Sequence, residues 1–139
     1  MKTIIISLLL STCAMMSLNA VASIVVIFHP SNTNNVDAKQ IRSMYLAKTH
    51  VFPDGEKVTP LDVADESEVK KIFSKKVLRK SPSSLNSYWS RMIFSAKGKP
   101  PKALSMSGVK ARVAIDKNAM GYIDSELVDD SVKVILTLD

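Results

Sequence analysis

The sequence predicts an α/β fold, a three-layer sandwich in which helices cover both faces of a mainly parallel or mixed sheet. Three observations lead to this prediction. Short apolar runs rich in β-branched residues, as at 23–30 and 57–63, are typical of strands. Segments whose apolar residues recur at helical spacing lie between them, as at 37–47. No repeat or long linker divides the chain, and strands separated by helices in one domain are typical of a helix-covered sheet.

The N-terminus has the pattern of a secretory signal. Lys2 precedes the apolar run 4–18, and the small residues Ala20 and Ala22 stand just before a cut ahead of Ser23. The run is shorter than the ~20 residues that a membrane-spanning helix needs. We therefore expect the signal to be cleaved, no transmembrane segment to remain, and the protein to be periplasmic.

Removal of residues 1–22 leaves a single domain over 23–139. The chain's one cysteine, Cys13, lies in the signal, so the mature domain must be held by its core without a disulfide. The letters LSTC around Cys13 also suggest a lipoprotein site, but Thr12 fits poorly before the cysteine. Lipidation of Cys13 stays as the alternative.

The chain is basic, with 19 lysines and arginines against 13 acidic residues and a formal net charge of +6. This surface favours acidic partners, anionic lipid or anionic solutes, whereas export argues against nucleic acid as a partner. Six cations gather in one segment: Lys70, Lys71, Lys75, Lys76, Arg79 and Lys80. We interpret them as a solvated helix face, with a docking patch as the alternative.

Short-range signals predict the first elements. The run 24–28 is continuous and apolar and is soon stopped by a proline, which suits a strand buried on both faces. Asp37 with Gln40 three residues later predicts a helix start, and this helix should reach about Ala47. The letters FPDG at 52–55 predict a turn, after which the second strand follows.

The next helix is expected after the second strand, with four apolar residues at helical spacing: Val69, Ile72, Phe73 and Val77. Three acidic residues crowd its first turn: Asp65, Glu66 and Glu68. The positive end of a helix dipole stabilises carboxylates as well as bound anions. We therefore expect the chain's own acidic side chains, rather than a bound anion, to interact with the positive end of this helix dipole.

Ser81 before Pro82 predicts a third helix, with proline at its first position. Its buried face is expected to comprise Leu85, Trp89, Met92 and Ala96. The helix should end at Gly98, and KPPK at 99–102 predicts an extended surface loop. A fourth helix should start near Ser105 or Ser107, followed by a short strand at 121–123 and a last strand that closes the chain.

Catalysis has little support in the sequence. His29 and His50 are the chain's two histidines, and neither stands in a motif with a nucleophile or at metal-ligand spacing. The nucleophile elbow, the zinc motif and the phosphate-cradling glycine loop are all missing. We therefore predict no catalytic residue, no metal and no cofactor, although a triad assembled in space would leave no such motif.

Small-anion binding has better candidates. In open α/β sheets, ligands sit at the carboxyl ends of strands beside helix starts. Hydroxyls and amides follow the predicted strands there: Ser31, Asn32 and Thr33, then Ser67, then Ser105, Ser107 and Gly108. They suit a small oxyanion such as phosphate, although Ser and Asn are also ordinary cap and loop residues.

The order of segments resembles phosphate-type periplasmic solute-binding proteins. QIRSMYLAKTHVFPDGEKVTPLDV at 40–63 is similar to that family's helix, turn and strand, and FSKKVL, the Trp89 helix with GKPP, and MGYI follow in the family's order. The resemblance spans about 25–123. It implies the periplasmic-binding-protein-like fold and a phosphate-type ABC transporter substrate-binding protein, with a membrane transporter as partner.

The resemblance also shows two departures. Family members are longer chains whose two lobes close over the anion, so this chain resembles one lobe, and a homodimer could rebuild a cleft between two lobes. Where the family has an arginine and then a glycine-serine-glycine-threonine run, this chain has Val63 and then ESEV, so that only Ser67 is retained. Glu66 and Glu68 would repel phosphate. The resemblance therefore implies a degenerate anion site, and the alternative is an accessory or protein-interaction module of the envelope without a small-molecule ligand.

Overall fold

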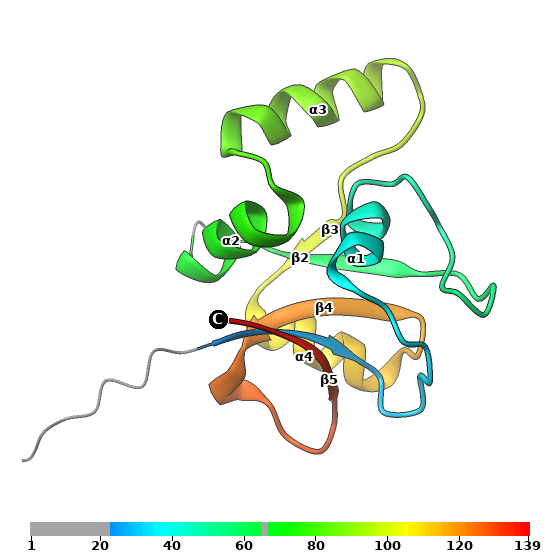
Figure 1. Ribbon diagram of the computed structural model, residues 1–139, viewed down its shortest axis with the longest axis vertical. Coiled ribbons are helices and arrows are strands. Elements are labelled where there is room, and N and C mark those ends of the chain that lie inside the picture. The colour runs from blue at the N-terminus through cyan, green and yellow to red at the C-terminus, as the bar shows by residue number, and fades with distance from the viewer. Residues whose placement is uncertain (1–22, 65–66) are drawn as a thin grey trace, which may run out of the picture.

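The computed structural model describes residues 23–64 and 67–139, so the predicted signal and the acidic pair Asp65 and Glu66 lie outside the described residues. Within these ranges the chain forms five strands and four α-helices (Figure 1). In chain order the elements are β1 (Ile24–Phe28), α1 (Ala38–Tyr45), β2 (Thr59–Val63), α2 (Glu68–Phe73), the π-helix η1 (Ser74–Leu78), α3 (Pro82–Phe94), β3 (Lys102–Leu104), α4 (Met106–Ile115), β4 (Ala119–Asp124), the 3-10 helix η2 (Ser125–Leu127) and β5 (Lys133–Leu138). None of the helices in these ranges is long and apolar enough to cross a membrane.

The strands form one mixed sheet in the order β3-β2-β4-β1-β5. β2 runs parallel to β3 and β4, whereas β1 is antiparallel to both of its neighbours, β4 and β5. The predicted α/β class with a mixed sheet is confirmed. Because β1 runs against β4, the loop after β1 and the loop after β2 lie at opposite ends of the sheet.

Helices lie on both faces of this sheet, with α4 on one side and α1 and α2 on the other (Figure 1). A Cβ atom at Gly121 of β4 would meet Val109 Cγ1 of α4 at 2.2 Å, so glycine is what permits this close approach. On the other face, Phe73 of α2 stacks on Tyr122 of β4 with ring centroids 3.8 Å apart, and Tyr45 of α1 packs edge-on against Phe73. These contacts make the three predicted layers.

The capping signals locate the helix starts as predicted. The Asp37 carboxylate accepts a hydrogen bond from the Gln40 N–H (2.8 Å), and the Gln40 side chain accepts one from the Asp37 N–H (2.9 Å). Ser81 caps α3 and Ser105 caps α4, each by accepting from the N–H three residues on. These bonds satisfy N–H groups that have no partner within the helix.

The ends of α1 and α3 differ from the prediction because an alanine takes the left-handed position after each helix. α1 ends at Tyr45, with Ala47 at φ 58°. α3 ends at Phe94 rather than at Gly98, with the exposed Ala96 at φ 55°. Two backbone hydrogen bonds of the Schellman type close each end. Gly98 instead permits a close approach, since a Cβ atom there would lie 3.2 Å from Ala47 Cβ.

The predicted buried face of α3 is wrong. No residue of this helix is fully buried, and Leu85, Trp89 and Met92 are half-buried. Figure 1 shows the reason, because α3 stands apart from the sheet with α1 and η1 between them. One contact of α3 with α1 is a hydrogen bond that the Tyr88 hydroxyl donates to Leu46 O (2.5 Å).

Three elements were not predicted. η1 continues α2 as a π-helix, β3 begins at Lys102, the last residue of the predicted loop 99–102, and the 3-10 helix η2 follows β4. The π-helix lies against α1, where Arg42 Nε donates a 2.7 Å hydrogen bond to Val77 O. It ends at Leu78, and its C-cap residue Arg79 takes the left-handed conformation at φ 55°. A tight chain reversal thereby connects η1 to α3.

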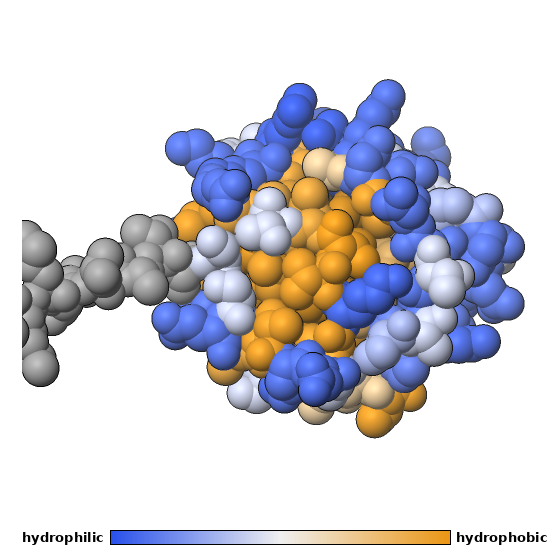
Figure 2. Space-filling view, turned by 60° about the horizontal axis from the view of Figure 1, so that its bottom comes forward, coloured by the Kyte–Doolittle hydropathy of each residue, from blue (hydrophilic) through white to orange (hydrophobic). Residues whose placement is uncertain are grey.

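β5 forms one edge of the sheet, beyond the helices that pack on β1, β2 and β4. Ile135, Leu136 and Leu138 are therefore only half-buried, and Val134 is 39 % exposed. Figure 2 brings the lower side of Figure 1 forward and shows apolar residues gathered in one area ringed by polar ones. The described residues leave this apolar surface uncovered.

Candidate functional site

The polar loop after β1 is held by its own hydrogen bonds. The buried Asn32 side chain donates to Lys117 O (3.2 Å) and accepts from the Asn34 N–H (2.9 Å). The Ser31 N–H donates to His29 Nδ1 (3.1 Å), and the Ser31 hydroxyl lies 2.7 Å from the same atom. These contacts give Ser31 and Asn32 structural roles in the loop.

Ser67 caps α2 by accepting a hydrogen bond from the Lys70 N–H (3.4 Å). It follows β2 and therefore lies at the opposite end of the sheet from Ser31, Asn32 and Thr33, which follow the antiparallel β1. The expectation that these residues line one edge is wrong, because it assumed that β1 runs parallel to β2. The two groups cannot bind the same ion.

Ser105 lies at the same end of the sheet as Ser67, because it follows β3 and β3 is parallel to β2. The Ala64 N–H donates to Leu104 O (2.8 Å), which ties the chain after β2 to the end of β3. The Ser105 hydroxyl accepts from the Gly108 N–H (3.1 Å) and so acts as a helix cap. The structure thus brings Ser67 and Ser105 to one edge, each in a capping role.

A carboxylate marks the end of β2. Val63 is fully buried, and its N–H donates to Asp62 Oδ1 (2.8 Å). The Tyr122 hydroxyl donates to the same oxygen, and Lys70 Nζ lies 3.4 Å from Asp62 Oδ2. The position that would hold an arginine, according to the family resemblance, therefore holds a core valine, and the nearest cation is already paired.

A groove of about 1040 Å³ opens between α2 with η1 on one side and α3 on the other. Five cations of the basic segment line it: Lys70, Lys71, Lys75, Arg79 and Lys80. Large apolar side chains of α3 line it as well: Leu85, Trp89 and Ile93. The groove thus combines positive charge with apolar surface, and Lys76, which belongs to the same basic segment, does not line it.

The cations of the groove differ in their partners. Lys70 pairs with Asp62 at 3.4 Å, and Lys71 pairs with the exposed Glu68 at 3.6 Å. Lys75, Arg79 and Lys80 have no carboxylate within ion-pair distance among residues 23–64 and 67–139. The net charge of the lining is therefore positive.

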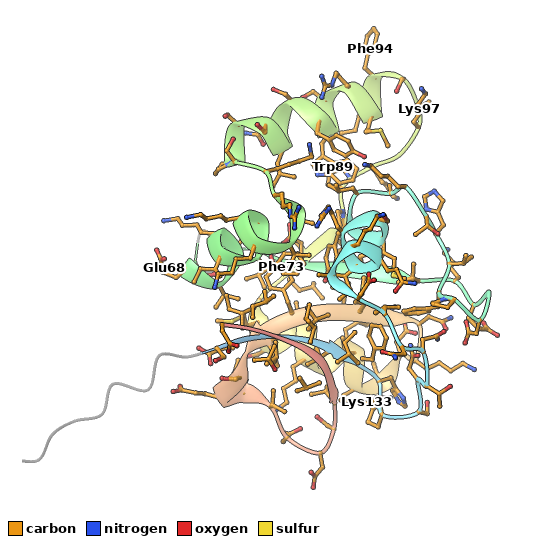
Figure 3. The ribbon with its side chains drawn as sticks, in the orientation of Figure 1. Glu68, Phe73, Trp89, Phe94, Lys97 and Lys133 are labelled. Atoms are coloured by element: carbon orange, nitrogen blue, oxygen red, sulfur yellow. The ribbon has the colours of Figure 1, made fainter. Side chains whose placement is uncertain are left out.

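The apolar side of the groove is formed by α3. Figure 3 shows Trp89 on the side of α3 that faces the rest of the molecule, whereas Phe94 points away from it. The Trp89 ring packs edge-on against Tyr88 with centroids 5.0 Å apart, and Lys80 Nζ lies 5.1 Å from the Tyr88 ring centroid. Ile93 is 57 % exposed at the end of this wall. A ligand in the groove can contact both aromatic and cationic groups.

Sequence reasoning assigned Leu85 and Trp89 to the core and the cations to a solvated face, so it missed that they line one groove. Periodicity alone does not tell a core-facing stripe from a groove-facing one. The described residues contain no group of three or more His, Cys, Asp or Glu side chains arranged to hold a metal ion. The site offers a binding surface that combines positive charge with apolar side chains.

The fold is similar to that of solved phosphate-binding proteins. A structure from Clostridium perfringens with bound phosphate matches at a TM-score of 0.62 and 19 % identity, over 82 % of this chain and 44 % of that one. An ABC-type phosphate transport receptor from Vibrio cholerae matches at 0.64 and 17 % identity, over 82 % and 45 %. PstS from Borrelia burgdorferi matches at 0.59 and 9 % identity, over 82 % and 46 %. No protein-family model and no curated protein sequence matches the chain.

The chain thus spans less than half the length of each of these proteins. Sequence identities of 9 to 19 % show similarity of fold, not of ligand. The predicted relation to phosphate-type binding proteins is confirmed at this level. The five-stranded unit with helices on both faces has the fold of one lobe of phosphate ABC transporter substrate-binding proteins.

Proposed function

We propose that the chain is a non-enzymatic binding protein, exported to the periplasm, that keeps the fold of a phosphate receptor lobe around a degenerate anion site. The observation that carries this proposal lies at the end of β2. Val63 is fully buried there, and the polar group beside it is the Asp62 carboxylate. Phosphate recognition needs donors and positive charge, whereas a carboxylate repels the ion.

Two further observations support the proposal. The remaining candidates for an anion site lie at opposite ends of the sheet, so Ser67 cannot form one binding site with Ser31, Asn32 and Thr33. The structures that share the fold include a phosphate transport receptor and a protein with bound phosphate, which supports the class of binding protein. The signal pattern over 1–22 supports export.

Thermal unfolding of the mature protein, freed of phosphate, tests this proposal. We expect no shift of the unfolding midpoint in millimolar phosphate or sulfate at constant ionic strength. A ligand at 100 times its dissociation constant would add about 2.7 kcal/mol to the free energy of unfolding. Each kcal/mol would raise the unfolding midpoint of a domain of this size by about 2 to 8 °C.

A midpoint that rises with one oxyanion, saturates, and no longer rises in Ser67→Ala would show a working receptor and contradict the proposal. Ser31→Ala is the matched control, because it removes a loop hydroxyl at the other end of the sheet. Equal shifts with phosphate, sulfate and chloride would show a salt effect, which the proposal permits.

A second candidate function is an accessory or protein-interaction module with no small-molecule ligand. The groove between η1 and α3 favours it, because its cations and apolar side chains form a surface larger than a phosphate ion needs. The partner would be a membrane transporter or another envelope protein. A homodimer remains a further proposal, to be tested by the mass of the mature protein in solution.

A further inference from the structure

We propose that the groove between η1 and α3 binds an acidic peptide segment of a partner protein, one that carries a large apolar side chain among its carboxylates. This inference deepens the second candidate function, the interaction module. It rests on one juxtaposition: cations of η1 and the turn after it face a tryptophan-bearing wall of α3 across a groove of about 1040 Å³.

The size of the groove favours a peptide over a small ion. Pockets for small molecules are about 300 to 1,000 Å³ and enclose most of the ligand. This groove, of about 1040 Å³, lies just above that range and is open, with walls contributed by α2, η1 and α3. A phosphate ion would touch a small part of it, whereas a segment of several residues can follow its length.

The charge of the groove selects an acidic occupant. Lys75, Arg79 and Lys80 line it with no carboxylate within ion-pair distance in the described ranges. Carboxylates of a bound segment would pair with these cations, and Arg79 can bind a carboxylate with two parallel hydrogen bonds. Among residues 23–64 and 67–139, Asp62 is the one carboxylate that lines the groove, and it is already paired with Lys70.

The α3 wall selects an apolar side chain as well. Trp89, Leu85 and Ile93 present apolar surface toward the groove, and tryptophan and arginine are the residue types that dominate binding energy at protein interfaces. A flat lipid surface would contact the outward-pointing Phe94, which is 95 % exposed, rather than the inward-facing Trp89. The geometry therefore favours a peptide over a membrane.

Both walls are anchored on α1 or on its C-cap residue Leu46, so the groove exists before anything binds. Arg42 Nε holds η1 through Val77 O at 2.7 Å. The Tyr88 hydroxyl holds α3 through Leu46 O at 2.5 Å. A preformed groove avoids part of the ordering cost that binding otherwise incurs.

Trp89 is the chain's single tryptophan, so its fluorescence reports on the groove directly. The probe is a short tryptophan-free peptide of glutamate and aspartate with leucine and phenylalanine. Its two matched peptides replace either the carboxylates by amides or the apolar residues by serine. We expect a saturable change of Trp89 emission with the acidic-apolar peptide, and about tenfold weaker binding of each matched peptide. The affinity should fall as sodium chloride is raised.

Charge reversal in the groove provides the variant test. Lys75→Glu/Lys80→Glu should weaken peptide binding at least about tenfold, because it replaces two attractions by repulsions. Lys57→Glu/Lys76→Glu changes the net charge of the protein equally at exposed positions that do not line the groove, and should change the affinity less than twofold. Circular dichroism of both variants checks that each is folded.

Several results would overturn the inference. Equal weakening by both double variants would show general charge attraction. Absence of saturable binding of the acidic-apolar peptide would show that the groove is not such a site, and a Trp89 response only to phosphatidylglycerol vesicles would assign it to a membrane surface. These failures differ from failure of the proposed function, which shows as phosphate stabilisation that is lost in Ser67→Ala.

Discussion

Val63 and Asp62 determine what the end of β2 can bind. The Val63 side chain points into the core and is fully buried, so an arginine at that position would have to bury its charge, which is strongly unfavourable. Asp62 accepts hydrogen bonds from the Val63 N–H and from the Tyr122 hydroxyl. A single substitution at position 63 therefore does not restore a phosphate site.

Tyr45 makes the stability of the fold depend on pH in the alkaline range. Burial raises the pKa of its hydroxyl well above the ordinary 10.0, and the nearby Tyr122 and Asp62 raise it further. The unfolded chain loses this proton from about pH 10 upward, while the folded chain keeps it. The stabilisation is therefore fully present below pH 10 and is lost as the pH rises above it.

Tyr45→Phe should remove this part of the pH dependence. It should also lower the free energy of unfolding at neutral pH by about 1 kcal/mol, because the hydroxyl donates a 2.9 Å hydrogen bond to Leu61 O in the core. Urea unfolding of both proteins between pH 7 and pH 11 measures the two effects together. If the free energies of unfolding of the two proteins, plotted against pH, stay parallel above pH 10, Tyr45 does not titrate as described.

At the scale of elements, capping chemistry was predictable and strand direction was not. Asp37, Ser81 and Ser105 cap their helices as the sequence indicates, because a cap is decided by residues three positions apart. The apolar pattern of 24–28 is compatible with a strand that runs parallel or antiparallel to its neighbours. The misplacement of Ser31 relative to Ser67 follows from that ambiguity.

The C-terminal ends of helices were also harder to predict than their starts. Glycine usually takes the left-handed position after a helix, so Gly98 was the natural choice for the end of α3. The structure places Ala96 there at φ 55°, whereas Gly98 lies close to Ala47, where a Cβ atom would be 3.2 Å from Ala47 Cβ. The contact of Gly98 with Ala47 joins residues far apart in the sequence, and short-range patterns do not contain such contacts.

Ala96→Gly should raise the free energy of unfolding by about 0.5 to 1 kcal/mol. The left-handed conformation costs a residue with a Cβ atom about 1 to 2 kcal/mol, from which the larger entropy of glycine in the unfolded chain subtracts. Ala111→Gly is the control, because Ala111 is an exposed residue within α4 and should lose about 1 kcal/mol. Denaturant unfolding of the two variants should therefore give changes of opposite sign, and a loss in both would contradict the φ of Ala96.

At the scale of the whole molecule, the order of segments predicted the fold correctly although no single motif is specific. Structures with 9 to 19 % identity share the architecture over 82 % of this chain. A fold is specified by many weak signals that agree, whereas an anion site depends on a few side chains. The sequence alone identified Val63 as a departure from the family pattern. The groove could not be predicted in this way, because it depends on where α3 lies.

An NMR titration of the labelled mature protein, first with phosphate and then with the acidic-apolar peptide, distinguishes an interaction module from an anion receptor. We expect saturable shifts of amide signals from η1 and α3 with the peptide, and none near Ser67 with phosphate at constant ionic strength. Saturable phosphate shifts at Ser67 and Lys70, with η1 and α3 unmoved by the peptide, would contradict this expectation. The protein would then be a working anion receptor.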